Sequence, residues 1–352
     1  MPETMKAVTF HGVRDVRVDE VPKPELQDPD DALVRIEKSA ICGSDLHPYH
    51  GRVEIEDGFV LGHEYSGTVE AVGSGVTQIS EGDAVVGSFM VCCGKCWFCR
   101  RGQFAKCLGV AVFGFGMAFG DLDGAQAEYV RVPKADLTLR RIPQNGFEHE
   151  DFLFVGDILT TGYDAVRKAR MLPGDVVAVI GAGPVGLCTI MAASALGAGR
   201  VVAIDMVPER LKLAEGLGAI PVNPAETEPD DVVLDLTDWR GADLVVDAVG
   251  HESALRATFP LVRMGGAISV AGVYNEDEIS IPFGDMWLRN VTMYTGIANI
   301  QAHMDEVLEL VRDGKLRPKE IISHRMPLTA AAEGYELFDS KEALKVVLDP
   351  RG

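Results

Sequence analysis

Residues 176–186 read VVAVIGAGPVG, an apolar run that ends in three glycines with the spacing G-x-G-x-x-G. The run predicts a buried strand, and Gly181, Gly183 and Gly186 predict a tight turn from that strand into a helix. In such a turn the first glycine reverses the chain, the second lets the backbone approach a pyrophosphate, and the third allows close helix packing. The helix N-terminus offers N–H groups and partial positive charge to the phosphates. The stretch therefore predicts a dinucleotide-binding unit.

An acidic residue follows at a position that selects between dinucleotides. Asp205 ends the next apolar run, VVAID, nineteen residues after Gly186. A carboxylate there accepts hydrogen bonds from a ribose 2′-OH and repels a 2′-phosphate, so the sequence favours NAD over NADP. Arg210 is placed to cover the adenosine side, with a solvated helix residue as the alternative reading. The other cofactor contacts that we expect are Thr161, Pro184, Val185, Val249 and Val273.

The chain changes character near residue 156. Before it, short β-rich runs such as EYSGTVEAVG and GDAVVGSF are separated by Gly- and Pro-containing turns. They predict a folded-over β domain that is partly barrel-like. After it, continuous apolar runs such as ADLVVDAVG alternate with helical stretches, which predicts a parallel, doubly wound sheet. A length of 352 residues also favours two domains over one core. We therefore expect an α/β protein with two domains.

Composition excludes several classes of protein. Hydrophobic residues make up 47% and charged residues 24% of the chain, as in ordinary globular proteins. No apolar run approaches the roughly 18 residues that cross a bilayer, and MPETMKAVTFHG is unlike a signal peptide, so we expect a cytoplasmic protein without a membrane partner. The net charge of −20 argues against a nucleic-acid partner. It indicates a solvated acidic surface, with adaptation to salt as the alternative.

Five of the seven cysteines lie in one short stretch, CCGKCWFCRRGQFAKC. Without the first of them, the spacing is C-x2-C-x2-C-x7-C, in which one loop wraps a tetrahedral metal. Using Cys92 in place of its neighbour breaks the two-residue spacing. A redox dithiol needs only one pair, usually at a helix N-terminus, and simple buried cysteines are the other alternative. We expect a structural zinc with Cys92 outside its shell, bound by Cys93, Cys96, Cys99 and Cys107.

Three other stretches contain side chains that suit a metal with an open coordination position. Singly, each has an ordinary explanation: a surface histidine, a core cysteine, or a carboxylate that caps a helix. Together they offer a thiolate, an imidazole and a carboxylate, the ligand types of a catalytic zinc. The residues are Cys42, Ser44, Asp45 and His47 in ICGSDLH, His63 and Glu64 in VLGHEYSG, and Asp157 in VGDILTTGY. Candidate pocket walls, with core packing as the alternative, are Phe89, Phe113 and Trp287.

The motifs ICGSD, GHEYSG, the four-cysteine loop, DILTTGYDAV and GAGPVG occur in the order seen in zinc-containing medium-chain alcohol dehydrogenases, which the whole chain resembles. The resemblance implies a GroES-like catalytic domain, residues 1–156 completed by 296–352, and a Rossmann domain, residues 157–295. It implies exchangeable NAD, two zincs per subunit and a small-molecule alcohol or carbonyl substrate. The chain length resembles that of the family's tetramers, so we expect a homotetramer.

The resemblance also assigns roles to the second donor set. It places Cys42, His63 and Asp157 at the catalytic zinc, with Glu64 as a neighbour that can approach or bind the metal. Ser44 and His47 match the family's proton relay.

Asp157 departs from the best-known members of the family, which have cysteine there. Aspartate occurs in some bacterial secondary-alcohol dehydrogenases and in formaldehyde dehydrogenase-like members. A polyol, sugar or formaldehyde-type dehydrogenase of the same family is the alternative activity. Two other classes compete: a zinc-free quinone reductase-like member, and a non-catalytic zinc-binding interaction protein. The first has no need of the metal ligands, and the second leaves the glycine motif and Asp205 unexplained.

Overall fold

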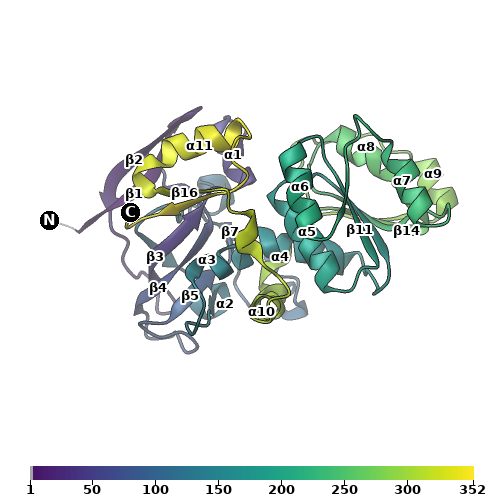
Figure 1. The fold of residues 1–352 in the computed structure, drawn as a ribbon. Coiled ribbons are helices and arrows are strands. Elements are labelled where there is room, and N and C mark those ends of the chain that lie inside the picture. The colour runs from purple at the N-terminus through teal and green to yellow at the C-terminus, as the bar shows by residue number, and fades with distance from the viewer. Residues whose placement is uncertain (1–2) are drawn as a thin grey trace. The chain divides into compact units, whose positions relative to one another are not determined.

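The computed structural model describes residues 3–352, which divide into two compact units. Unit 1 comprises Met1–Asp157, Asn299–Arg312 and Arg317–Gly352, and unit 2 comprises Ile158–Ala298 and Asp313–Leu316. The sequence places the first boundary one residue earlier and the second three residues earlier. Unit 2 is the teal-to-green part of the ribbon in Figure 1.

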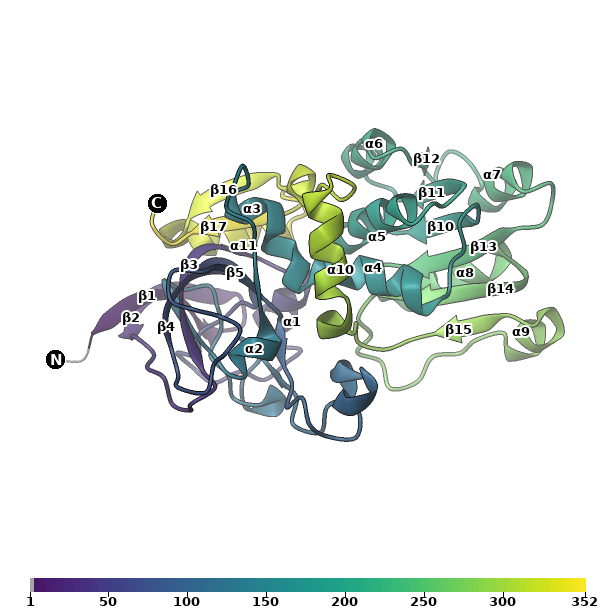
Figure 2. The same ribbon diagram turned by 90° about the horizontal axis from the view of Figure 1, so that it is seen from below.

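Unit 2 is built on a six-stranded parallel sheet with the order β12-β11-β10-β13-β14-β15. Figure 2 shows these strands in that order. The central strand, VVAVI, is buried at every position, as expected for a parallel strand covered on both faces. The strands are β10 (Val176–Ile180), β11 (Arg200–Ile204), β12 (Ile220–Val222), β13 (Ala242–Asp247), β14 (Val262–Val270) and β15 (Thr292–Tyr294).

The strand order of unit 2 reverses between β10 and β13, the place where ligands bind in open α/β sheets. Three of its helices begin with proline, whose fixed φ and missing N–H suit the first helical turn. The helices are α4 (Ile158–Lys168), α5 (Pro184–Ala195), α6 (Pro208–Gly216), α7 (Pro229–Leu236), α8 (Glu252–Leu261) and α9 (Phe283–Arg289). The doubly wound Rossmann fold predicted from the sequence is confirmed.

Unit 1 is β-rich. Its main sheet has the order β16-β17-β3-β4-β5-β9, and β8 also pairs with β3. A hairpin of β1 and β2 and a short β6–β7 pair complete the strands. These are β1 (Thr4–Gly12), β2 (Asp15–Pro22), β3 (Ala32–Ala40), β4 (Glu64–Val72), β5 (Ala84–Gly87), β6 (Met90–Val91), β7 (Ala111–Val112), β8 (Tyr129–Val132), β9 (Leu139–Arg141), β16 (His324–Pro327) and β17 (Val346–Asp349).

The C-terminal segment belongs to unit 1 because β17 pairs antiparallel with β3. One core cluster of the unit includes residues from both ends of the chain, such as Val8 and Leu348. The α-helices of unit 1 are α1 (Leu46–Tyr49), α2 (Ala135–Thr138), α3 (His149–Phe152), α10 (Ile300–Arg312) and α11 (Ala331–Asp339). Its 3-10 helices are η1 (Gly43–Asp45), η2 (Cys99–Arg101), η3 (Phe104–Lys106), η4 (Met117–Phe119), η5 (Leu153–Gly156), η6 (Pro318–Ile321) and η7 (Leu328–Ala330). In the part of the chain that the structure describes, no helix is long and apolar enough to span a membrane.

The glycine turn after β10 leaves no room for side chains at two of its positions. Gly181 has φ +90°, a conformation that favours glycine. A Cβ on Gly186 would lie 1.8 Å from the carbonyl oxygen of Gly181, so α5 approaches the turn as closely as its backbone allows. Gly183 caps α5, which begins at Pro184.

We expect Gly186→Ala to lower the melting temperature of the protein, because its methyl group overlaps a backbone oxygen that cannot move freely. Overpacking of this kind costs about 1–3 kcal/mol. The matched control is Gly216→Ala, at the end of α6, where a Cβ meets nothing within 4 Å. This control should keep or raise stability, since alanine is favoured in helices by up to about 1 kcal/mol. Equal melting curves for the two variants would contradict the close packing described for α5.

Candidate functional site

Three of the residues singled out in the sequence meet inside unit 1. Donor atoms of Cys42, His63 and Asp157 lie within 4.8 Å of one another, and all three residues are buried. Cys42 follows β3 and His63 precedes β4, and these strands are antiparallel partners in which Ala40 pairs with Glu64. The strand register therefore brings the thiol and the imidazole together.

Asp157 reaches the same place through a close backbone contact. It follows η5, whose last residue, Gly156, would carry a Cβ only 1.7 Å from the carbonyl oxygen of Gly87 at the end of β5. The carbonyl oxygen of Gly156 also accepts a hydrogen bond from the N–H of Phe89 at 2.9 Å. Glycine at position 156 thus allows the chain to pass the sheet and present the carboxylate.

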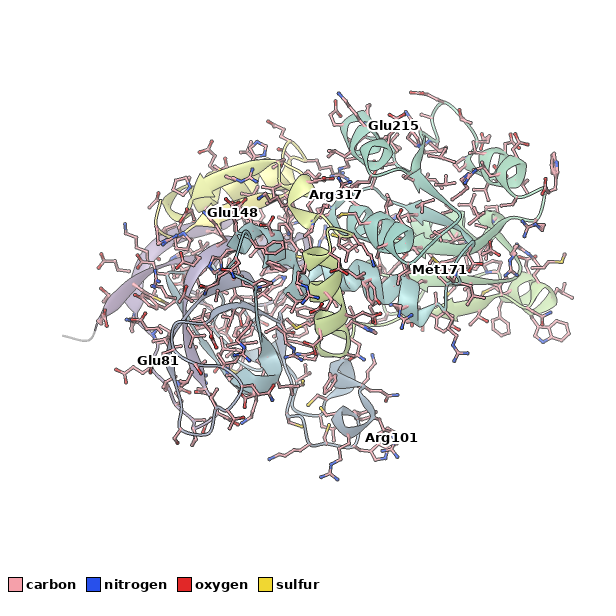
Figure 3. The ribbon with its side chains drawn as sticks, turned by 60° about the horizontal axis from the view of Figure 1, so that its bottom comes forward. Glu81, Arg101, Glu148, Met171, Glu215 and Arg317 are labelled. Atoms are coloured by element: carbon pink, nitrogen blue, oxygen red, sulfur yellow. The ribbon has the colours of Figure 1, made fainter. Side chains whose placement is uncertain are left out.

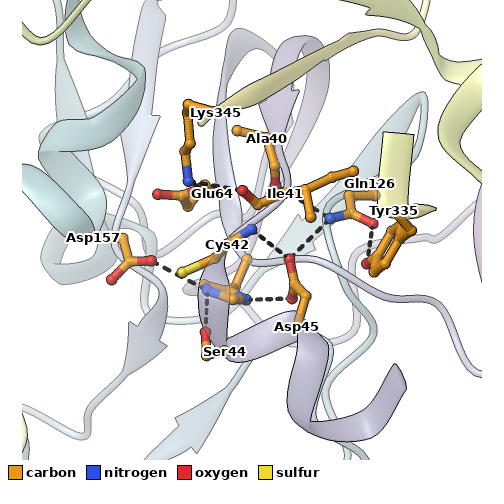
Figure 4. A network of polar contacts seen from close by, with 11 residues as sticks. Ala40, Ile41, Cys42, Ser44, Asp45, Glu64, Gln126, Asp157, Tyr335 and Lys345 are labelled. Carbon is orange, nitrogen blue, oxygen red and sulfur yellow. Dashed lines mark hydrogen bonds and ion pairs between the residues drawn. The ribbon is translucent and has the colours of Figure 1, made fainter. Parts of the chain in front are cut away.

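Asp45 fixes the orientation of the His63 ring. Asp45 Oδ1 lies 3.1 Å from His63 Nδ1, and Asp45 Oδ2 accepts a hydrogen bond from the N–H of Cys42 at 2.8 Å. The other ring nitrogen, Nε2, lies 3.1 Å from Ser44 Oγ and 3.2 Å from Asp157 Oδ2. Asp45, Ser44 and Asp157 are labelled in Figure 4, where dashed lines mark these contacts. One nitrogen is therefore held by Asp45, and the other faces the remaining donors.

A second layer of polar residues holds Asp45 in turn. Gln126 Nε2 donates to Asp45 Oδ2 at 3.1 Å and to the carbonyl oxygen of Ala40 at 3.2 Å. The Tyr335 hydroxyl donates to Gln126 Oε1 at 2.8 Å, and both residues are fully buried. Sequence reasoning did not find Gln126 or Tyr335, because nothing in the local sequence indicates that they contact Asp45.

Glu64 forms an ion pair with Lys345, and neither side chain is exposed to solvent. The Lys345 ammonium also donates to the carbonyl oxygen of Ile41 at 2.9 Å and lies 5.2 Å from the centre of the Phe154 ring. Figure 4 shows Lys345 between Glu64 and Ile41. Burial raises the pKa of Glu64 to about 7, although the charge of Lys345 acts in the opposite direction. Within the run ALKVVLDP, a lysine among apolar residues is the signal that could have indicated a buried acidic partner.

The donor set suits zinc. Asp157 Oδ2 is buried and, apart from its 3.2 Å approach to His63 Nε2, meets no hydrogen-bond partner, so a cation would satisfy it. Burial raises the pKa of the Cys42 thiol, and the negative charges of Asp157 and Glu64 raise it further. A divalent ion reverses that tendency because it favours the thiolate. Sulfur, nitrogen and oxygen ligands from three residues match zinc with one open position.

Of the two predicted relay residues, Ser44 contacts this group through His63, and His47 lies on the following helix. Ser44 belongs to η1, and His47 is half-buried on α1. Burial lowers the pKa of His47, and the charge of Arg52 lowers it further, so its imidazole is neutral near pH 7.

Aromatic residues flank the donor group unevenly. The Phe89 and Phe115 rings lie 6.1 Å and 5.4 Å from that of His63. Phe113 instead packs edge-on against Tyr65 in the core, and Trp287 is 72% exposed on α9 in unit 2. The sequence did not single out Phe115, because FGFG offers two phenylalanines and only the fold separates their roles.

The cysteine loop brings four sulfur atoms together within 4.8 Å, and Cys92 is not among them. Cys92 is fully buried, and burial raises the pKa of its thiol to about 12. Backbone N–H groups lower the pKa of Cys96 to about 6, which favours a thiolate. Arg101, labelled in Figure 3, lies 3.8 Å above the Trp97 ring in this loop. The four sulfurs that converge belong to Cys93, Cys96, Cys99 and Cys107.

The residues expected to bind a dinucleotide lie in unit 2. Asp205 follows β11; its carboxylate accepts hydrogen bonds from the N–H groups of Ala182 at 2.7 Å and Val207 at 2.9 Å. Arg210 Nη1 lies 3.8 Å from the same carboxylate. The aspartate thus ties the glycine turn to the start of α6.

The other residues expected to contact the cofactor differ in how far they are exposed to solvent. Val249 follows β13 and is 50% exposed, and Val273 follows β14 and is 56% exposed. Thr161 and Val185 are half-buried on α4 and α5, which pack together.

The chain is similar to known proteins over nearly its whole length. The family model described as the alcohol dehydrogenase GroES-like domain matches residues 28–144, and the one described as zinc-binding dehydrogenase matches residues 184–313. A zinc-type alcohol dehydrogenase-like protein of Bacillus subtilis is 38% identical, with 98% of this chain and 100% of that protein covered. Zinc-type alcohol dehydrogenase B of Aspergillus flavus is 39% identical, with 97% and 81% covered.

Among solved structures, alcohol dehydrogenase TADH from Thermus sp. ATN1 is similar over 98% of this chain and 99% of its own, with 47% identity and a TM-score of 0.95. The two family models, the relatives that match over nearly the whole chain and this structure all point to one family. The chain therefore belongs to the zinc-type alcohol dehydrogenase family.

Proposed function

We propose that this oxidoreductase is an NAD-dependent zinc alcohol dehydrogenase that interconverts a primary or secondary alcohol with its aldehyde or ketone. The observation that carries the proposal is the convergence of Cys42, His63 and Asp157 at one buried point of unit 1. We assign these three residues to a catalytic zinc and the four-cysteine loop to a structural zinc. Glu64 bonds to Lys345 in this structure, so we place it outside the ligand set in this conformation.

The proposed chemistry needs zinc and NAD, when they are bound, together with side chains of the protein. Zinc supplies a Lewis acid that lowers the pKa of an alcohol, and NAD supplies the hydride acceptor. Ser44 Oγ, 3.1 Å from His63 Nε2, is placed to hold the proton that the alcohol loses. His47 is a neutral base near pH 7 and is placed to pass that proton to solvent. Asp45 keeps the His63 ring oriented during these steps.

The surroundings of His63 favour an apolar alcohol over a polyol. Phe89 and Phe115 present rings within 6.1 Å of the imidazole, and Phe115 continues to Phe119, whose ring lies 5.7 Å away. Phe119 is 42% exposed, so a row of aromatic side chains leads from His63 to the surface of unit 1. A polyol would need hydroxyl partners along this wall. Oxidation of polyols, sugars or formaldehyde is the alternative activity. One substrate screen that includes these compounds and simple alcohols compares the two.

Zinc analysis together with an NADH titration separates this proposal from its rivals. Two zincs per subunit and NADH binding support it. A protein that binds nicotinamide cofactor without zinc fits a quinone reductase-like member of the family, and one that binds zinc without NADH fits an interaction protein.

We predict that Asp157→Ala loses one zinc per subunit and its alcohol oxidation, because the variant lacks a metal ligand. Its affinity for NADH should stay near that of the wild type, since the glycine turn is untouched. Zinc content by mass spectrometry, NADH fluorescence and activity measure the three effects. Asp157→Cys is the matched control, because a thiolate restores a ligand and should retain the metal. Full zinc content in Asp157→Ala would mean that the aspartate is only structural.

For the cysteine loop, we expect Cys99→Ser to reduce the zinc content by one per subunit and to lower the melting temperature, because a structural zinc contributes folding free energy. Cys92→Ser should keep both zincs, since its sulfur lies outside the converging group. Its stability should change less than that of Cys99→Ser. Metal analysis and melting curves on both variants decide the register. Loss of zinc from Cys92→Ser would show that the assigned set is displaced by one residue.

We expect the wild type to prefer NAD over NADP in kcat/KM by at least about tenfold, equivalent to about 1.4 kcal/mol. Asp205 is the cause, through repulsion of a 2′-phosphate. Asp205→Ser should narrow this ratio. The Asp205 carboxylate also accepts a hydrogen bond from the glycine turn, so its loss can lower kcat/KM for both cofactors. The ratio of the two kcat/KM values is therefore the proper readout. Glu209→Gln, an exposed charge change on α6, should leave the ratio unchanged. Equal use of both cofactors by the wild type would reject this assignment.

A further inference from the structure

Unit 2 contains a fully buried carboxylate that the proposed chemistry does not use. Asp247 ends β13, the strand beside β10 at the centre of the sheet, and its side chain is not exposed. Its Oδ1 accepts hydrogen bonds from the N–H groups of Val249 at 2.9 Å and Gly250 at 3.2 Å. Asp247 therefore shapes the loop that follows its own strand.

The hydroxyl of Tyr274 closes the other side of this carboxylate. Tyr274 Oη lies 2.6 Å from Asp247 Oδ2 and 2.8 Å from the carbonyl oxygen of His251. Burial raises the pKa of Tyr274, and the hydrogen bond to Asp247 raises it further, so the phenol keeps its proton to donate. A hydrogen bond to a charged acceptor is stronger than one between neutral groups. Tyr274 thus links the loop after β14 to the loop after β13.

The backbones of these two loops touch. The carbonyl oxygen of Asp247 accepts hydrogen bonds from the N–H groups of Ala271 at 2.8 Å and Gly272 at 3.0 Å. A Cβ on Gly250 would lie 2.4 Å from the carbonyl oxygen of Val273, and a Cβ on Gly272 would lie 2.1 Å from the nitrogen of Gly250. The separation of the loops is therefore fixed by backbone contact as well as by the Asp247–Tyr274 bond.

Each loop presents one half-exposed valine at the C-terminal edge of the sheet. Val249 and Val273 are 50% and 56% exposed, although both are apolar. Val249 Cγ2 lies 2.6 Å from the position of a Cβ on Gly181, so this valine adjoins the glycine turn. Asp205 and Arg210, which we assign to the adenosine end, lie on the far side of the turn, after β11.

We propose that Asp247 and Tyr274 are positioning residues for the nicotinamide half of the cofactor. By joining the loops after β13 and β14, the pair holds Val249 and Val273 in place as an apolar surface against which one face of the planar nicotinamide ring packs. The inference rests on the proposed function, because it assumes that a nicotinamide dinucleotide binds at the glycine turn. Neither residue touches the reacting atoms, and the effect is on where the ring lies.

The test compares NADH with ADP-ribose, which has the same adenosine and pyrophosphate but no nicotinamide. Tyr274→Phe removes one hydroxyl and keeps the ring. We expect its Kd for NADH to rise about three- to tenfold while its Kd for ADP-ribose and its melting temperature stay near the wild-type values. Tyr294→Phe, on β15 of the same sheet, is the matched control and should change neither affinity. NADH fluorescence and calorimetry with ADP-ribose give the two constants.

A second variant changes the positions of the same two valines through the backbone of the loops. Gly272→Ala leaves both side chains of the pair intact but forces the loops apart, and it should also weaken NADH more than ADP-ribose. Unchanged NADH affinity in Tyr274→Phe would overturn the inference, as would equal losses for NADH and ADP-ribose, which indicate a general structural role. A wild type that binds neither ligand would instead reject the proposed function itself.

Discussion

Buried charge is the constraint on which unit 1 depends. Lys345 is a fully buried ammonium, and an unpaired charge in such a place costs several kcal/mol. It is satisfied by Glu64 and by the carbonyl oxygen of Ile41, which are the direct neighbours in sequence of His63 and Cys42. One side chain from the C-terminal segment therefore ties together the two strand ends that carry the thiol and the imidazole. We therefore expect the donor group to depend on that segment, whose strand β17 pairs with β3.

The same constraint explains the chain of polar residues behind His63. An imidazole that lies among a thiol, a hydroxyl and a carboxylate can rotate and change tautomer unless one nitrogen is occupied. Asp45 occupies it, Gln126 holds Asp45, and Tyr335 holds Gln126. Outer contacts of this kind orient metal-binding histidines in general. With Lys345 nearby, a divalent ion would offset the negative charges of the Cys42 thiolate and of the Asp157 and Glu64 carboxylates, so the proposed zinc suits the sign of the charge as well as the donor types.

Local sequence patterns were sufficient to predict the elements that are formed by residues close together in the chain. The strand, turn and helix around Gly181 follow from residues that are adjacent in the chain, and the doubly wound sheet was predicted from alternating apolar and helical runs. The cysteine loop is similar, because its spacing alone determines that four sulfurs can converge while the sulfur of Cys92 does not.

The remaining site residues depend on partners distant in the chain. Lys345 meets Glu64 across 281 positions, and Tyr335 meets Gln126 across 209 positions. Asp45 stands within the quoted motif ICGSDLH, yet its role needs His63, which only the β3–β4 register brings near. Phe113 and Phe115 are two residues apart, but one is core and the other faces His63. No periodicity in the sequence distinguishes such cases, because tertiary packing alone decides them.

The central claim is that Cys42, His63 and Asp157 bind a zinc ion, and anomalous diffraction from crystals of the purified protein at the zinc absorption edge tests it most directly. Data on either side of the edge identify the metal and locate it. We predict one zinc peak bonded to Cys42 Sγ, His63 Nε2 and the Asp157 carboxylate, and a second peak among the four sulfurs of the cysteine loop. A peak at the cysteine loop alone, in protein that is active with alcohol and NAD, would contradict the account.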